Sequence, residues 1–183
     1  MPDRLLQLIK NDQVAMSSLK AVRDVGPPDA YLAAGFIRNR YWDSLYATVS
    51  ECPDVDIDVV YYDCKKYSKS LDQGYEQALE CHLATGIWQV RNQARMHSFG
   101  NYPPFSGLSH ALCHWAETAT TVGVRLTGAE QLQVIAPYGL DDLYGHILRI
   151  TTPMEQNDPV GFKNRLEVKG WQKRWPKLTV IGP

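Results

Sequence analysis

The sequence predicts an α/β protein, because stretches with the composition of strands alternate with longer stretches that have the apolar periodicity of helices. A short apolar strand at residues 31–34 runs into Gly35 and then into a helical pattern at residues 36–45. The next strand, residues 54–61, is rich in Val, Ile and Tyr but carries three acids where a buried structural strand would carry none. This order of strand, glycine turn, helix and acidic strand is the strongest indication of function.

Length and composition indicate a globular chain that forms one domain over residues 1–183. Hydrophobic residues make up 44% and charged residues 21% of the chain, which is ordinary for a soluble protein. The formal charge of −1 provides no overall attraction to nucleic acid, so contact with a polyanion needs a local basic patch. The N-terminus has no signal-peptide pattern, and no apolar run approaches the ~20 residues that span a bilayer. We therefore expect no association with membranes.

The cysteines and histidines form no strong disulfide or metal pattern. Four scattered cysteines without a Cys-x-x-Cys pair favour a reduced chain in the cytoplasm: Cys52, Cys64, Cys81 and Cys113. His110 and His114 have the i, i+4 spacing that can hold zinc on a helix, but no further ligand cluster accompanies them. We expect a structural or surface role for this histidine pair.

The N-terminal segment, residues 1–26, has the periodicity of helices. Apolar positions over residues 3–23 predict two amphipathic helices, and Asp12 can cap the second one. The loop at residues 26–29, Gly-Pro-Pro-Asp, then ends the helical segment and leads into the strand at residues 31–34.

Gly35 stands where the first strand turns into a helix. A glycine at such a turn lets backbone N–H groups approach a bound anion, and the helix N-terminus favours phosphate through its dipole. Arg38 and Asn39, in the first turns of this helix, can supplement a phosphate site. Glycine turns are also common without any ligand, so this motif alone leaves a purely structural turn open.

Asp56 and Asp58 lie two residues apart on the acidic strand and therefore share one face, with Cα atoms roughly 7 Å apart. The apolar side chains of the strand point to the other face: Val55, Ile57, Val59 and Tyr61. Two carboxylates this close repel unless a cation neutralises them, and Mg²⁺ or Mn²⁺ suits such a pair. The alternative is an edge strand whose acids, Asp54 included, face solvent and prevent aggregation.

Beyond the acidic strand, a helix is expected at residues 68–84 and a strand at residues 88–97. Arg91, Arg95 and His97 would share one face of that strand and form a cationic row able to grip phosphate. The alternative is an exposed polar strand face without a ligand.

The last third of the chain is expected to contain a loop at residues 101–105, a helix at 109–115 and a hairpin of strands 118–126 and 132–136. A helix begins near Gly139, and Asp141 or Asp142 is expected to cap it or to interact favourably with its dipole. Residues 152–159 are expected to form a linker. Residues 159–178 form a basic helical segment whose apolar side docks on the body. Its basic residues face solvent or attract nucleic acid: Lys163, Arg165, Lys169, Lys173, Arg174 and Lys177.

The motifs taken together resemble the DNA polymerase β-like nucleotidyltransferase superfamily, and in particular a bacterial nucleotidyltransferase family once catalogued as a domain of unknown function. The resemblance covers roughly residue 30 to the end of the chain. It is carried by residues 32–39 (LAAGFIRN), 42–43 (WD), 56–61 (DIDVVY), 92–97 (NQARMH), 117–120 (ETAT), 122–125 (VGVR), 136–137 (AP), 139–143 (GLDDL), 169–171 (KGW) and 175–178 (WPKL).

The resemblance implies a polymerase β-like fold, a mixed sheet flanked by helices with a C-terminal helical segment. It also implies a metal-dependent nucleotidyltransferase that uses Mg²⁺ or Mn²⁺ and transfers a nucleoside monophosphate from a nucleoside triphosphate to an unknown hydroxyl. The acceptor can be RNA, a small metabolite or a protein side chain. Asp56 and Asp58 would be the catalytic metal ligands. The nucleotide would be bound by Gly35, Phe36, Arg38, Asn39, Gln93 and Arg95.

Two departures from the superfamily pattern support an alternative function. Gly35 is followed by Phe36, whereas the turn of the wider superfamily usually reads Gly-Gly or Gly-Ser. Many members also carry a third carboxylate on a following strand, where this chain offers Asn92 or Gln93, with Glu117 as a further candidate. The alternative is therefore a nucleotide- or metabolite-binding module with weak or no catalytic activity. A third hypothesis is a nucleic-acid-binding protein that uses the basic C-terminal segment.

Overall fold

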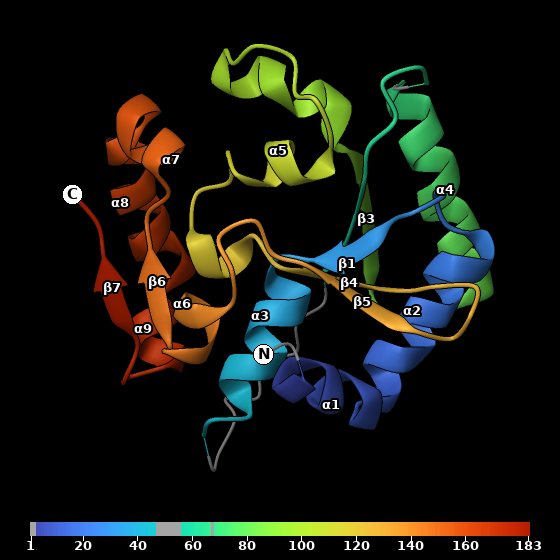
Figure 1. The fold of residues 1–183 in the computed structure, drawn as a ribbon, viewed down its shortest axis with the longest axis horizontal. Helices are drawn as coiled ribbons and strands as arrows, with labels where there is room; N and C mark the ends of the chain where they lie inside the picture. Colours follow the sequence, from blue (N-terminus) through green and yellow to red (C-terminus); the bar gives the residue numbers. More distant parts are fainter. Residues whose placement is uncertain (1–2, 47–55, 67) are drawn as a thin grey trace.

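The acidic strand lies inside a mixed sheet with the strand order β3-β2-β1-β4-β5. Figure 1 labels β1, β3, β4 and β5 of this sheet. This computed structural model describes residues 3–46, 56–66 and 68–183. Strand β2 pairs with β3 in parallel and with β1 antiparallel, and β4 pairs antiparallel with both β1 and β5. The predicted α/β class is confirmed.

Seven strands are found among the described residues. The strands are β1 (Tyr31–Ala33), β2 (Asp56–Tyr61), β3 (Ile87–Asn92), β4 (Gly123–Leu126), β5 (Leu132–Ile135), and the separate parallel pair β6 (Ile147–Arg149) and β7 (Thr179–Ile181). The helices are α1 (Asp3–Asn11), α2 (Gln13–Val25), α3 (Gly35–Asp43), α4 (Lys69–His82), α5 (Leu108–Leu112), α6 (Asp141–Tyr144), α7 (Thr152–Asn157), α8 (Pro159–Lys169) and α9 (Trp171–Arg174). Two 3-10 helices are η1 (Gln93–Gly100) and η2 (Thr118–Thr120).

The two predicted N-terminal helices are present as α1 and α2. Asp12 caps α2 as expected, since its Oδ1 atom accepts a hydrogen bond of 2.9 Å from the backbone N–H of Ala15. Gly26 closes this helix through an N–H bond to the carbonyl of Val22, and a Cβ at position 26 would lie only 2.6 Å from that oxygen. Only glycine therefore fits the bend that leads into β1.

The sheet buries its two faces differently. The main core lies against the face that carries Ile57, Val59 and Tyr61, and helices α1 to α4 all contribute side chains to it. On the opposite face, Ala33 and Val60 pack beneath Leu112 of α5. Because side chains alternate along a strand, Asp56 and Asp58 lie on this second face, beyond the patch that α5 contacts.

Several predicted elements are wrong in extent. Strand β3 ends at Asn92, because the Asn92 side chain accepts hydrogen bonds from the N–H groups of Ala94 (3.0 Å) and Asp63 (3.1 Å) and starts η1. The cationic row that a strand at 88–97 would form is therefore not present. The predicted strand 118–126 begins with η2, and the predicted linker 152–159 contains α7. The pair β6 and β7 was not expected.

The C-terminal segment docks on helix α3, as its apolar side predicted. Trp175 is 1% exposed and packs edge to face on Trp42, with 5.0 Å between ring centroids. Asp43, the last residue of α3, accepts hydrogen bonds from the indole N–H of Trp175 (2.9 Å) and from the Arg174 guanidinium (2.6 Å). Figure 1 shows helices α6 to α9 gathered with β6 and β7 on one side of α3. Of the helices described, none has the length and apolarity to cross a membrane.

Candidate functional site

Two carboxylates stand at the start of β2. Asp56 is exposed, Ile57 is 2% exposed, Asp58 is half-buried and Val59 is fully buried, so burial alternates along the strand as the sequence predicts. Asp56 and Asp58 consequently project from the same face of the sheet. Asp54 and Val55, which were expected in the same strand, lie outside the described residues.

Burial, one neighbouring carboxylate and three cations together determine the pKa of Asp58. Burial raises the pKa of Asp58 to about 6, and the neighbouring Asp56 carboxylate adds to the increase. The positive charges of Arg38, Arg91 and Lys169 oppose it. These cations belong to α3, β3 and the end of α8, so three elements that are distant in sequence contribute positive charge to the environment of one acid.

The glycine turn lies beside the acids because β1 pairs with β2 through Leu32 and Val59 before it turns into α3. Ala34 has a φ of 56° and a ψ of −134°, a conformation that L side chains rarely adopt and that stores strain at this turn. A Cβ at Gly35 would lie 3.5 Å from Asn39 and 3.8 Å from Arg38. The absence of a side chain at position 35 therefore leaves space in front of both residues.

Helix α3 begins at this turn without a side-chain cap. The first N–H groups of a helix have no partner within the helix, and they carry the positive end of its dipole. The N-terminus of α3 thus offers backbone donors next to the glycine, which suits an anionic ligand.

Arg38 is held firmly although it is a charged residue with only 4% exposure. Its guanidinium donates to Thr120 Oγ1 (2.7 Å) and to Asn39 Oδ1 (2.8 Å). The same group lies 4.7 Å from the centroid of the Trp171 ring, close enough for a cation–π contact. Arg38 is therefore oriented by its own helix, by η2 and by the C-terminal segment.

A buried chain of polar contacts continues behind Arg38. Thr120 donates to Glu117 Oε2 (2.8 Å), and Glu117, which is fully buried, pairs with Arg165 of α8. Glu117 was a candidate for a third metal ligand, but its carboxylate is already occupied by Thr120 and Arg165. Among the residues that the structure describes, no third His, Cys, Asp or Glu joins the pair Asp56 and Asp58.

Three of the predicted nucleotide-binding side chains have other partners. The side chain of Phe36 is 1% exposed and belongs to the core, which leaves only its backbone for a ligand. Gln93 is buried and accepts a bond of 3.1 Å from the indole N–H of Trp115. Arg95 forms an ion pair with Asp72, which accepts a hydrogen bond from Tyr61 on the core face of the sheet. Gln93 and Arg95 therefore have partners other than the acids, whereas the charge of Arg38 acts on Asp58, and Gly35 and Asn39 lie next to Arg38.

Thr120, Lys169 and Trp171 lie in the motifs ETAT and KGW that carry the family resemblance, but no local signal in the sequence places them against Arg38 or Asp58. Lys169 was otherwise identified as one of several basic residues in the C-terminal segment. Its signal was weak because a lysine at the end of a helix is usually a solvated charge.

The histidine pair has the structural role that the sequence predicts. His110 and His114 lie with ring centroids 5.1 Å apart, and both contact Phe105, at 5.3 and 4.7 Å. These side chains form an aromatic cluster with Tyr102 at the base of α5.

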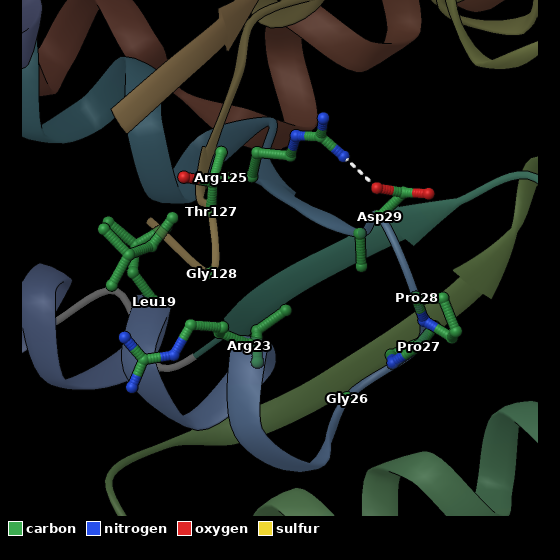
Figure 2. A pocket seen from close by; sticks show the side chains of 12 residues that line it. Leu19, Arg23, Gly26, Pro27, Pro28, Asp29, Arg125, Thr127 and Gly128 are labelled. Atoms are coloured by element: carbon green, nitrogen blue, oxygen red, sulfur yellow. Dashed lines mark hydrogen bonds and ion pairs between the residues drawn. The ribbon is translucent and has the colours of Figure 1, made fainter. Parts of the chain in front are cut away.

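A cavity of about 380 Å³ lies at the other end of β1, between α2 and the hairpin of β4 and β5. Figure 2 shows Arg23 and Arg125 on its walls, with Arg125 reaching Asp29, and Pro27 and Pro28 along one side. None of the candidate site residues lines this cavity. Both arginines already pair with carboxylates, so the cavity offers no unpaired cation to an anionic ligand.

Comparisons with known proteins agree with this geometry. The sequence model of a family described as nucleotidyltransferase matches residues 20–180. An NMR structure described as revealing a CCA-adding enzyme head domain is 27% identical, with a TM-score of 0.84, and the match covers 99% of this chain and 96% of that chain. No curated protein matches this chain.

Two larger solved structures share the fold. A CCA-adding enzyme in complex with CTP is 13% identical, with a TM-score of 0.61, and the match covers 97% of this chain and 42% of that one. The Thermotoga maritima CCA-adding enzyme complexed with tRNA is 14% identical, with a TM-score of 0.59, 96% coverage of this chain and 42% of that one. This chain thus spans about two fifths of those enzymes. The expected polymerase β-like nucleotidyltransferase fold is confirmed.

Proposed function

We propose that this chain, which belongs to the nucleotidyltransferase family, transfers a nucleoside monophosphate from a nucleoside triphosphate to an acceptor hydroxyl with the help of a divalent metal ion. The observation that carries the proposal is the convergence of two carboxylates, one glycine turn and three cations at the start of β2.

The residues present fit a hard divalent cation. Asp56 and Asp58 are oxygen ligands on one strand face, and their mutual repulsion raises the pKa of Asp58 beyond the effect of burial alone. Mg²⁺ commonly takes one or two protein carboxylates and completes its octahedron with water and phosphate oxygens, so a third protein ligand is not required. When bound, Mg²⁺ or Mn²⁺ would neutralise charge on the phosphates.

The triphosphate would lie over the glycine turn. The free N–H groups at the start of α3 would donate to phosphate oxygens, and Arg38 would present a guanidinium that is already oriented. Asn39 would hold Arg38 in place, because its Oδ1 atom accepts from both the Nε and an NH2 group of that arginine. Lys169 would add a further positive charge.

In the proposed reaction, the acceptor oxygen forms a bond to the α-phosphorus while the bond from that phosphorus to the bridging oxygen of the β-phosphate breaks. Pyrophosphate leaves, and the hydroxyl proton passes to solvent. The chain's own residues contribute by positioning the phosphates and by stabilising the charge that develops on them.

The test combines metal binding with turnover. Binding of Mn²⁺, followed by electron paramagnetic resonance, is expected to be lost in Asp56→Asn and Asp58→Asn and retained in Glu155→Gln, an exposed acid on α7. With labelled triphosphates and pooled acceptors, release of pyrophosphate is expected to fall at least about 100-fold in both Asp variants. Normal Mn²⁺ binding by both Asp variants would contradict the proposed metal site.

The same assay distinguishes the proposed nucleotidyl transfer from the alternative function. A chain that binds triphosphate and Mn²⁺ but releases no pyrophosphate with any acceptor would be a nucleotide-binding module. This alternative is supported by the lack of a third carboxylate beside Asp56 and Asp58 among the described residues.

A cytoplasmic location also stays a prediction, based on the scattered cysteines.

Lys169 provides a further prediction, because its proposed role rests on its electrostatic effect on Asp58. Lys169→Ala is expected to raise KM for the triphosphate by roughly tenfold or more with a smaller effect on kcat, because a charged contact to phosphate is lost. Lys163→Ala, which removes an exposed lysine from the same helix, is the matched control. Equal effects of the two substitutions would exclude a specific contact by Lys169.

A further inference from the structure

A second pocket, of about 340 Å³, lies between α4, the end of β3 and η1. Strand β3 is an edge strand of the sheet, and Figure 1 labels both β3 and α4. The lining of the pocket includes three cations, Lys69, Arg91 and Arg95, and the side chains of Met96 and Phe99 from η1. The two acids in the same lining pair with two of these cations, Asp72 with Arg95 and Glu76 with Arg91, so Lys69 is the lining cation that forms no ion pair with a described residue. The pocket therefore combines cationic and aromatic groups in one place.

The ion pair of Arg95 uses only part of the hydrogen-bonding capacity of its guanidinium group. One NH2 group contacts Asp72, whereas the Nε atom is buried and has no hydrogen-bond partner among the residues described. A buried donor without a partner costs free energy. Lys69, at the start of α4, is exposed and forms no ion pair with any described residue.

Phe99 is the most exposed aromatic side chain beside this pocket, with 81% of its surface accessible. A large apolar ring this exposed is unfavourable in water unless it serves as a contact surface. An aromatic face next to cations is the combination that binds single-stranded nucleic acids, in which bases stack on rings and phosphates contact cations. The loop that precedes α4 carries Lys65 and Lys66 outside the lining of the pocket, and the Lys66 carbonyl accepts a hydrogen bond from the Asn92 side chain (3.1 Å) at the start of η1.

The pocket connects to the candidate active site through Arg91. This residue pairs in register with Val60, two positions along β2 from Asp58, and its guanidinium lines the pocket. Gln89 lies opposite Asp58 on the same face of the sheet. A nucleic-acid strand held in the pocket would therefore run along β3 toward the carboxylates of Asp56 and Asp58.

We propose that the pocket of Lys69, Arg91, Arg95 and Phe99 binds a single-stranded segment of a nucleic-acid acceptor, whose end then reaches Asp56 and Asp58. This inference rests on the proposed function and specifies the class of acceptor. Phe99 stacks on a base, Lys69 and Arg95 contact phosphates, and Arg91 directs the strand toward the site.

Binding is measured by fluorescence anisotropy with the full chain and a labelled single-stranded RNA of about 12 nucleotides. The affinity is expected to fall roughly 20-fold between 50 and 200 mM NaCl, as about three phosphate contacts to a single strand predict. A double-stranded RNA of the same sequence is expected to bind more weakly, because its bases cannot stack on Phe99.

The variants separate stacking from mere apolar contact. Phe99→Leu is expected to weaken binding at least about 5-fold, whereas Phe99→Tyr keeps the affinity because its ring still stacks. Lys69→Gln is expected to lower the slope of log affinity against log salt by about 0.7. Val168→Ala and Lys10→Gln, which alter exposed residues on α8 and α1, serve as controls.

The inference would be overturned if RNA binding did not depend on salt. It would also be overturned if Phe99→Leu and Lys69→Gln bound RNA as tightly as the native chain does. Asp56→Asn is expected to abolish turnover and to leave RNA binding intact, so the two proposals fail separately. Turnover with a small acceptor combined with no RNA binding would refute this inference and leave the proposed function standing.

Discussion

At the scale of single residues, Asp58 is the clearest case of a side chain whose position favours function over stability. Its carboxylate is half-buried next to Asp56, and burial is the larger of the two effects that raise its pKa to about 6. In the unfolded chain an aspartate titrates near 4. The folded protein therefore holds the Asp58 proton more tightly than the unfolded chain does.

This difference sets the sign of the pH dependence. Between pH about 4 and about 6 the folded state binds more protons, so the Asp58 carboxylate makes the fold less stable as the pH rises through that range. In metal-free buffer, Asp58→Asn is thus expected to raise the free energy of unfolding by about 1 kcal/mol at pH 7.5, discounted for partial exposure. The gain should vanish near pH 4.

Urea denaturation at both pH values, with EDTA present, measures this prediction. Glu155→Gln, an exposed acid far from the site in sequence, is the control and should show no such pH-dependent gain. A gain for Asp58→Asn that is equal at pH 4 and pH 7.5 would show that burial of this carboxylate is not its cause.

At the scale of elements, the turn from β1 into α3 is the feature that brings backbone donors to the acids. Ala34 occupies a conformation that suits glycine, with a φ of 56° and a ψ of −134°, immediately before Gly35. Neighbouring strands hold this turn in place: Leu32 pairs with Val59 on one side and with Val124 on the other. The strain is thus maintained by the sheet and is located at the proposed phosphate site.

Ala34→Gly is expected to stabilise the fold by about 1 kcal/mol, because glycine adopts this conformation without a Cβ clash. Ala34→Val should destabilise it by more than that. Thermal unfolding of the purified variants checks both signs. The matched control is Ala78→Gly in α4, where the helical conformation makes the same change destabilising by about 1 kcal/mol. A loss of stability in Ala34→Gly would contradict the strain at this turn.

At the scale of the whole molecule, the C-terminal segment supports the site from behind. Trp171 lies against Arg38, Arg165 pairs with Glu117, and Trp175 packs on Trp42 and donates to Asp43. The contacts of Trp171 and Trp175 join residues more than 100 positions apart, and the pair of Arg165 with Glu117 spans 48 positions. The proposed site therefore depends on segments from both halves of the chain.

Trp175→Ala is expected to lower the free energy of unfolding by about 3–5 kcal/mol, the usual loss for a buried tryptophan. Urea denaturation followed by circular dichroism measures it, and Val168→Ala on the exposed side of α8 should change stability by less than about 0.5 kcal/mol. A separate early transition in Trp175→Ala would show that the segment unfolds on its own, contrary to the single domain expected from the sequence.

Local sequence patterns predicted those features of this protein that depend only on residues close together in the sequence. Alternation in β2 indicated that Asp56 and Asp58 share a face, the glycine indicated the turn before α3, and Asp12 indicated the cap of α2. Each follows from backbone geometry over a few residues, so a single sequence contains it. The motif resemblance extended this to the polymerase β-like fold.

Only the tertiary structure decided which distant side chains join the acids. It placed Lys169 and Trp171 beside Asp58 and Arg38, and it turned Arg95 toward Asp72, because Asn92 ends β3 and begins a 3-10 helix. It also assigned Glu117 to Arg165 and Thr120. The physical reason is that burial, ion pairing and strand termination depend on long-range packing, which overrides the local preference of a β-rich stretch.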